Sequence, residues 1–180
     1  VQWVGYLSTT GVYGNRDGAW VDENSDLRPT STRSQRRIEA EDKWLRWGDS
    51  NGISTQIFRL AGIYGPGRSI VDQIKAGTAT RISKPGQVFS RIHVEDIATV
   101  LAASIANPQP GGIYNVCDDE PAASAEVTAY VCGLMNIAPP PLIPFEKAVL
   151  SPIGKSFWAD NRRVKNERIK AELAVKLAFP

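Results

Sequence analysis

The chain has 180 residues, of which 42% are hydrophobic, so it can bury one sizeable core and is too short for two typical domains. Its 21 lysines and arginines against 19 acidic residues leave a net charge of only +2, which gives no support for a nucleic-acid partner or an anionic membrane surface. No apolar run approaches the roughly 20 residues of a membrane span, and no basic leader with a hydrophobic core precedes the fold, so a cytoplasmic location is expected.

The first predicted element is a strand over residues 1–7, because β-branched and aromatic residues dominate VQWVGYL. Hydroxyl residues follow in LSTTGVYG, where Gly11 and Gly14 supply the backbone freedom for a turn. The chain opens on Val1 and on a strand that has the pattern of burial on both faces. We therefore expect the sequence to be the C-terminal portion of a longer protein.

A polar loop is expected over residues 15–32. QRRIEAEDKWLRW then predicts a helix of about four turns, because apolar residues recur in it at helical spacing. This helix should end near Gly48 and Gly52. STQIFRLAGIYG predicts a second strand that runs into a glycine turn, and the segment from Ser69 to Ala76 predicts a short helix closed by Gly77.

The next segments continue to alternate between strand and helix. SRIHVEDIATVLAASIAN predicts a short strand and then a helix, GGIYNVCDD a third strand, and SAEVTAYVCGLMN a helix capped by Ser124. This alternation predicts an α/β fold with a parallel sheet covered on both sides. We expect the sheet to include Gly5 to Ser8, Thr55 to Leu60 and Ile113 to Val116, with ligands beyond the carboxyl ends of its strands.

The last part of the chain is less regular. Prolines between Pro139 and Pro152 exclude a continuous helix there and predict a loop or a brief helix. RVKNERIKAELAVKL predicts a final helix, with Asn166 as its cap and a row of apolar residues on one face. These apolar residues are Ile169, Leu173 and Leu177.

Three segments together carry a resemblance: LSTTGVYG at 7–14, AGIYGPG at 61–67 and YNVCDD at 114–119. They resemble the extended short-chain dehydrogenase/reductase family, the NAD-dependent epimerase and dehydratase group, and are nearest to its atypical branch, whose members often lack the catalytic tyrosine. The resemblance implies a Rossmann-like sheet, the C-terminal part of a doubly wound fold. Residues 1–138 would then belong to the NAD(P)-binding domain, with a substrate-region insertion near 64–91, and residues 139–180 would form a small substrate-binding region.

The resemblance implies NAD or NADP as the cofactor, bound mainly by an N-terminal half whose Gly-x-x-Gly-x-x-Gly loop this chain lacks. Gly62, Gly65 and Gly67 imitate such a loop, but their spacing differs and Pro66 removes a donor that a phosphate cradle would need. In the family, the backbone after the second of the predicted strands passes beside the nicotinamide ring, and the end of the first strand also contacts the cofactor. The corresponding residues of this chain are Leu7, Ser8, Leu60, Ala61, Gly62 and Ile63.

Thr9 takes the place of the family's catalytic serine or threonine, three positions before the valine of the Val-Tyr-Gly turn. The resemblance implies that its hydroxyl bonds the substrate oxygen at which a proton and a hydride move. The alternative is that the hydroxyls of the turn only satisfy backbone groups. Tyr13 belongs to the turn and is expected to be structural.

Arg33 and Arg37 take the places of the family's catalytic tyrosine and lysine, after the anchor formed by Pro29 and Ser31. Because arginine stays protonated, Arg33 cannot shuttle a proton as a phenol does. Arg37 could still bond the cofactor's ribose or a phosphate through its five donors. The alternative is a solvated helix face on which Arg36, Arg37 and Glu41 pair locally.

Arg162 and Arg163 lie near Trp158 in a basic segment, a combination suited to binding the diphosphate of a sugar nucleotide. The alternative is a basic surface that faces solvent. No metal site is expected, because Cys117 and Cys132 fit no metal-ligand spacing, and His93 is expected to be packed rather than catalytic.

These observations lead to two hypotheses about function. The first is an NAD(P)-dependent oxidoreductase or epimerase-like enzyme that acts on a sugar nucleotide or a similar carbonyl or hydroxyl compound. The second is a non-catalytic NAD(P)-binding sensor or partner protein, which Arg33 in the tyrosine position favours. The expected partner is a small-molecule substrate. The resemblance also implies a possible homodimer, through the helix that contains Arg37 and the helix after the second strand.

Overall fold

A three-stranded parallel sheet forms the centre of the molecule, whose residues 2–180 are described by the computed structural model. The strand order is β1-β3-β7, and the register places Thr9 opposite Leu60 and Leu60 opposite Val116. All three strands predicted for the sheet are therefore confirmed, as is the parallel α/β fold. The strands are β1 (Trp3–Thr9), β3 (Ser54–Leu60) and β7 (Ile113–Val116).

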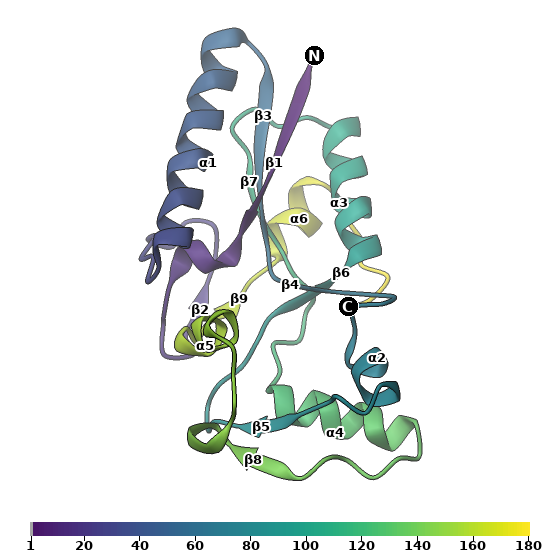
Figure 1. The fold of residues 1–180 in the computed structure, drawn as a ribbon. Coiled ribbons are helices and arrows are strands. Elements are labelled where there is room, and N and C mark those ends of the chain that lie inside the picture. The colour runs from purple at the N-terminus through teal and green to yellow at the C-terminus, as the bar shows by residue number, and fades with distance from the viewer. Residues whose placement is uncertain (1) are drawn as a thin grey trace.

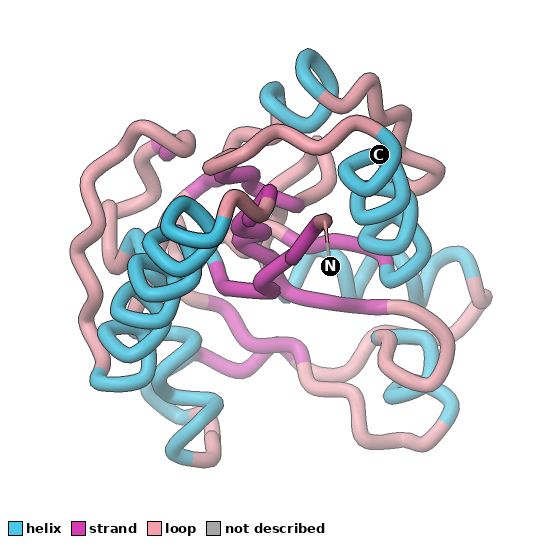
Figure 2. Tube along the Cα trace, turned by 90° about the horizontal axis from the view of Figure 1, so that it is seen from above, coloured by secondary structure: helices cyan, strands magenta, loops and turns pink. Residues whose placement is uncertain are grey.

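Helices cover both faces of this sheet, with α1 (Thr32–Asn51) on one side and α3 (Val94–Ala106) on the other (Figures 1 and 2). Helix α1 begins where the Ser31 hydroxyl accepts the N–H of Ser34, and it ends at Gly52, whose φ of 63° is left-handed and suits glycine. The long predicted helix is confirmed, and Gly52, not Gly48, is its end.

The main core lies between the sheet and the face that carries α3 and α6 (Glu167–Glu172). The rings of Phe58 and Tyr114 stack at 5.8 Å between centroids, and Ile92, Val100 and Ile169 are fully buried around them. The chain's end is thus anchored to the sheet by apolar burial.

A second group of elements lies below the sheet in Figure 1 and contains two further parallel strand pairs, β4 with β6 and β5 with β8. Helix α4 packs against β5 and α2. The strands are β4 (Gly62–Tyr64), β5 (Arg81–Ser83), β6 (Arg91–His93) and β8 (Leu142–Pro144). The helices are α2 (Ile70–Lys75), α4 (Ser124–Leu134) and α5 (Pro152–Ala159), with 3-10 turns η1 (Thr10–Tyr13) and η2 (Phe145–Lys147).

Three local predictions need correction. The loop predicted at 15–32 contains β2 (Trp20–Val21), which pairs with β9 (Arg163–Val164) far along the chain. Ser124 is the first residue of α4 and not its cap, which is Ala123. The final helix ends at Glu172, because Ala174 has a φ of +52°, so Leu177 lies beyond it.

The proposed division at residue 139 stays a prediction. Segments from before and after residue 139 pack together in both parts of the fold. In the lower part β8 pairs with β5, and in the main core α6 packs on β7. Among residues 2–180, every helix is too short or too polar to cross a lipid bilayer.

Candidate functional site

Thr9 lies at the carboxyl end of β1, directly beside the end of β3. Its Oγ1 atom accepts the N–H of Gly11 at 3.1 Å and so caps the turn η1. The backbone role considered for this hydroxyl is therefore present. The hydroxyl hydrogen makes no bond to any other residue in the described chain, so Thr9 also retains a donor that a ligand could use.

Ser8 faces the opposite way from Thr9, as alternation along a strand requires. Its side chain is buried and its hydroxyl donates to a carboxylate oxygen of Glu41 on α1. Leu7, in contrast, is 42% exposed. A cofactor contact of Ser8 would therefore use its backbone and not its hydroxyl.

A buried ion pair lies beneath this turn. Arg59 on β3 and Glu41 on α1 approach to 2.8 Å, and each side chain is only 4% exposed. Arg59 also donates to the Tyr13 hydroxyl at 3.0 Å, and that hydroxyl donates to Asn115 on β7 at 2.7 Å. These groups, together with Ser8, form one buried polar network that joins α1 to all three strands.

Burial and the contacts within this network shift the pKa values of Arg59 and Tyr13. Burial alone would lower the pKa of Arg59, but its bonds to Glu41 and Tyr13 outweigh burial and raise that pKa. Burial also raises the pKa of Tyr13 above its ordinary value, although Arg59 opposes this rise. Tyr13 is thus a neutral phenol and Arg59 a cation at neutral pH, which agrees with the structural role expected for Tyr13.

Arg33 and Arg37 lie one turn apart on α1. The Arg33 side chain is exposed, and its guanidinium carbon lies 5.8 Å from the centroid of the Phe157 ring on α5. Arg37 donates through Nη1 to the Tyr6 hydroxyl at 2.9 Å and to the Leu7 carbonyl at 3.1 Å. The alternative in which Arg37 pairs with Glu41 is wrong, because Glu41 is bonded to Arg59 and Ser8.

The backbone after β3 comes to the surface at Gly62. Leu60 and Ala61 are buried, Ile63 is half-buried and Gly62 is exposed. The Gly62 N–H donates to the Ser90 carbonyl at 3.1 Å, and a Cβ at Gly62 would lie 3.3 Å from that oxygen. This position suits glycine and leaves exposed backbone beside the end of β3, which we call the Gly62 surface.

The turn that follows Gly62 is not built as a phosphate cradle. Gly65 and Arg68 exchange both of their backbone hydrogen bonds, at 3.3 and 3.0 Å, so these amides are occupied. A Cβ at Gly65 would lie 2.7 Å from a methyl carbon of Val94, which shows that Gly65 faces packed side chains. The turn therefore offers little to a pyrophosphate.

Arg162 and Arg163 are bound to the backbone of residues 14–18. Arg162 donates to the Gly14 carbonyl at 2.9 Å and pairs with Asp160 at 3.1 Å. Arg163 donates to the Gly18 carbonyl. Burial lowers the pKa of Arg162, although Asp160 opposes this effect. Both guanidinium groups keep further N–H donors, but part of each is committed to holding the segment after the Thr9 turn.

His93 caps α3, as its Nδ1 accepts the N–H of Glu95 at 3.3 Å. Its ring packs against Tyr64 and Phe179, with centroid distances of 5.1 and 3.7 Å. The expectation that His93 is packed and hydrogen-bonded is confirmed.

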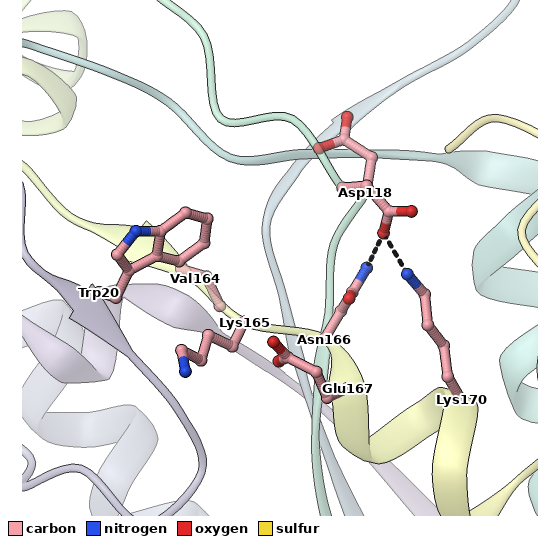
Figure 3. A pocket seen from close by; sticks show the side chains of 8 residues that line it. Trp20, Asp118, Val164, Lys165, Asn166, Glu167 and Lys170 are labelled. Atoms are coloured by element: carbon pink, nitrogen blue, oxygen red, sulfur yellow. Dashed lines mark hydrogen bonds and ion pairs between the residues drawn. The ribbon is translucent and has the colours of Figure 1, made fainter.

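A hollow of about 190 Å³ lies beyond the end of β7. The dashed lines in Figure 3 mark the bonds of Asn166 and Lys170 to the Asp119 carboxylate on its wall. Asn166 occupies the N-cap position of α6, as predicted, but its side chain donates to the Cys117 carbonyl and to Asp119 and makes no capping bond. The hollow is lined by Trp20, Asp118, Asp119, Val164, Lys165, Asn166, Glu167 and Lys170.

Asp118, which also lines this hollow, is a buried acid with an oxygen that is unsatisfied in the described part of the chain. It is 8% exposed, and its Oδ1 has no hydrogen-bond partner among residues 2–180. Burial raises its pKa to about 6, against the weaker opposing effects of the Arg91 backbone and guanidinium. The folded state therefore holds a proton on Asp118 that the unfolded chain releases at a lower pH.

Replacing Asp118 with asparagine should stabilise the protein near pH 7 and have little effect near pH 4. The pKa of Asp118 is higher in the folded protein than in the unfolded chain, so protonation of Asp118 favours folding. This contribution to stability is complete below the unfolded pKa near 3.8, and it is lost as the pH rises through the folded pKa of about 6. The gain at pH 7 should be at most about 3 kcal/mol. Urea unfolding at both pH values checks this, with the exposed neighbour change Glu120→Gln as control. Equal effects of Asp118→Asn at both pH values would contradict the assignment.

Comparison with known proteins begins with a family model, described as the NAD dependent epimerase/dehydratase family, which matches residues 1–117. The chain belongs to this family. The matched residues run to the end of β7, so they include Thr9, Arg33 on α1 and Gly62.

The chain is also similar to longer proteins of known sequence or structure. Protein YeeZ of Escherichia coli K12 is 32% identical over 164 residues, which are 90% of this chain and 55% of YeeZ. A structure described as a functionally unknown conserved protein from Silicibacter pomeroyi DSS is 54% identical, has a TM-score of 0.90, and is matched over 99% of this chain and 62% of its own. The chain thus spans about three fifths of these relatives.

The fold is also that of an enzyme solved with its cofactor. DesIV from Streptomyces venezuelae, described as a dTDP-glucose 4,6-dehydratase with NAD bound, has a TM-score of 0.79 at 20% identity, over 99% of this chain and 56% of that one. At this identity the likeness concerns the fold. It confirms the Rossmann-like architecture expected for an epimerase/dehydratase.

Proposed function

We propose that the protein is an NAD(P)-dependent oxidoreductase or epimerase of this family, acting on the hydroxyl or carbonyl group of a sugar nucleotide or a similar compound. The observation that carries this proposal is the position of Thr9 at the carboxyl end of β1 and of the exposed Gly62 backbone just beyond the carboxyl end of β3, because β1 and β3 are adjacent parallel strands. Ligands of open α/β sheets bind at such an edge. Family membership and the NAD bound to DesIV support the same cofactor class.

The residues present fit one end of a nicotinamide cofactor. Gly62 offers backbone without a side chain, and the side chains of Thr9 and Arg37 offer N–H and O–H donors. When bound, NAD or NADP would supply a hydride acceptor or donor. The pyrophosphate has no comparable partner at the Gly65 turn, so its binding is assigned to the rest of the longer protein.

Within this proposal the chain's own residues orient the substrate. Thr9 donates its free hydroxyl hydrogen to the substrate oxygen, and Arg33 attracts an anionic group without exchanging a proton. Arg37 is proposed to contact the cofactor's ribose or a phosphate. Arg162 and Arg163 lie beside the segment that follows the Thr9 turn, and their remaining donors are proposed to face the substrate's diphosphate.

A second candidate function is the binding of NAD(P) without turnover. One observation favours it: the residue in the phenol position is a guanidinium placed over the Phe157 ring. Arginine cannot serve as the proton donor of the family's usual reaction.

The two candidates are separated by measuring binding and turnover together in the full-length protein. Calorimetric titration with NADH and NADPH tests binding, and loss of absorbance at 340 nm with a panel of ketones and sugar nucleotides tests reduction. Binding with turnover supports the enzyme, and binding without turnover on any compound supports the second candidate. No binding of either nucleotide would contradict both.

A further inference from the structure

The buried pair Glu41 and Arg59 requires an explanation, because an apolar pair of similar volume would be at least as stable there. Moving two charges out of water costs several kcal/mol for each ion, and their attraction repays this only with good geometry. Both side chains are 4% exposed, so nearly the full cost applies. Some benefit other than stability would account for charge at this position.

The partners of the pair indicate what that benefit is. Glu41 accepts the hydroxyl of Ser8, which directly precedes Thr9, and Arg59 donates to Tyr13, the last residue of η1. The two ends of the Thr9 turn are therefore fixed by the two halves of one ion pair. Among residues 2–180, the side chain of Thr9 makes only the local bond to Gly11.

The ion pair also connects the Thr9 turn to α1 and to the end of β3. Glu41 lies on α1, the helix that carries Arg33 and Arg37, and Arg59 is the last residue but one of β3, just before the Gly62 surface. A rigid ion pair in this place sets the distances between these parts, because bidentate arginine–carboxylate bonds have a defined geometry. Arg59 donates through Nε to Glu41 Oε1 at 3.3 Å and through Nη2 to Oε2 at 2.8 Å.

We infer that Glu41 and Arg59 are positioning residues, which hold the Thr9 hydroxyl in place for a ligand at the ends of β1 and β3. The inference rests on the proposed function for the identity of that ligand. The positioning itself concerns the free protein and can be measured without any ligand.

The direct test is amide hydrogen exchange, resolved to single residues by NMR, on the full-length protein and its Ser8→Ala variant. This change removes the link between Glu41 and β1 but leaves the ion pair intact. Exchange at Gly11, whose N–H is bonded to Thr9 Oγ1, should become at least tenfold faster, since a bond to a charged group is lost. Exchange at Ile57 in the centre of β3 should change much less.

A matched control is Ser104→Ala on α3. Like Ser8, Ser104 is a buried serine whose hydroxyl donates to another side chain, here Gln56 of the sheet, but it lies away from the Thr9 turn. It should leave Gly11 exchange unchanged. Equal acceleration at Gly11 in both serine variants, or none in Ser8→Ala, would overturn the inference.

A double variant separates positioning from stability. Glu41→Leu combined with Arg59→Met replaces the ion pair by apolar groups, which is often neutral or stabilising. The unfolding midpoint in urea should stay the same or rise, whereas Gly11 exchange should become at least tenfold faster. Slow exchange at Gly11 in a folded double variant would show that the pair does not position the turn. If the wild-type protein binds neither NADH nor NADPH, the proposed function fails while these exchange results still decide the inference.

Discussion

Replacing Glu41 with alanine should lower the free energy of unfolding by about 3–5 kcal/mol, because it leaves the Arg59 guanidinium buried without a counter-ion. The Ser8 hydroxyl loses its acceptor at the same time. Urea unfolding followed by far-ultraviolet circular dichroism measures the loss of stability.

The neighbouring acid provides the control. Asp42 also pairs with an arginine, Arg46, at 2.9 Å, but the two side chains are 51% and 78% exposed. Asp42→Ala should cost no more than about 0.5 kcal/mol, as is usual for exposed pairs on a helix. A similar small loss for both variants would mean that the Glu41 pair is hydrated in solution.

Thr9→Ala should reduce kcat/KM of the full-length enzyme about a hundredfold or more, whereas Arg33→Ala should reduce it about tenfold. Thr9 is proposed to donate to the oxygen at which charge changes, and loss of one such donor typically costs two to three orders of magnitude. Arg33 cannot transfer a proton, so its removal costs only a binding contact, about 1.4 kcal/mol for each factor of ten. Steady-state kinetics with the substrate found in the turnover panel measures both.

Thr99→Ala is the control for the threonine change, because Thr99 is exposed on α3 and its hydroxyl donates only to its own helix, at Glu95. It should leave kcat/KM unchanged. Equal, full activity in Thr9→Ala and Arg33→Ala would place the chemistry elsewhere. Complete loss in Arg33→Ala alone would show that the arginine takes part in the reaction itself.

The sheet could be predicted from the sequence because its signals are local. The β-branched runs of β1, β3 and β7 and the helical spacing of α1 each identify one element, and alternation then requires a parallel arrangement. The β2 and β9 pairing has no such signal: each strand has two residues, and they lie more than a hundred positions apart. The early end of α6 depends on the left-handed Ala174, a residue type that seldom adopts this conformation.

The site was predicted only in part. Motif positions identified Thr9, Arg33 and Gly62, and the structure places Thr9 and the Gly62 backbone at the ends of neighbouring strands. The sequence did not reveal that Glu41 pairs with Arg59, since arginine and glutamate are usually exposed and nothing local distinguishes a buried pair. An available signal was the position of Arg59 between apolar residues of the strand, in IFRLA. The burial of Asp118, whose Oδ1 has no partner among residues 2–180, likewise arises from tertiary structure and has no local signal in the sequence.

The most direct measurement is a crystal structure of the full-length protein with NAD or NADP bound. The proposal predicts that the nicotinamide ring lies against the Gly62 backbone, with the Thr9 hydroxyl facing the same space and Arg37 directed toward the ribose or a phosphate. A nicotinamide ring placed away from the ends of β1 and β3, for example in the hollow beyond β7, would contradict it.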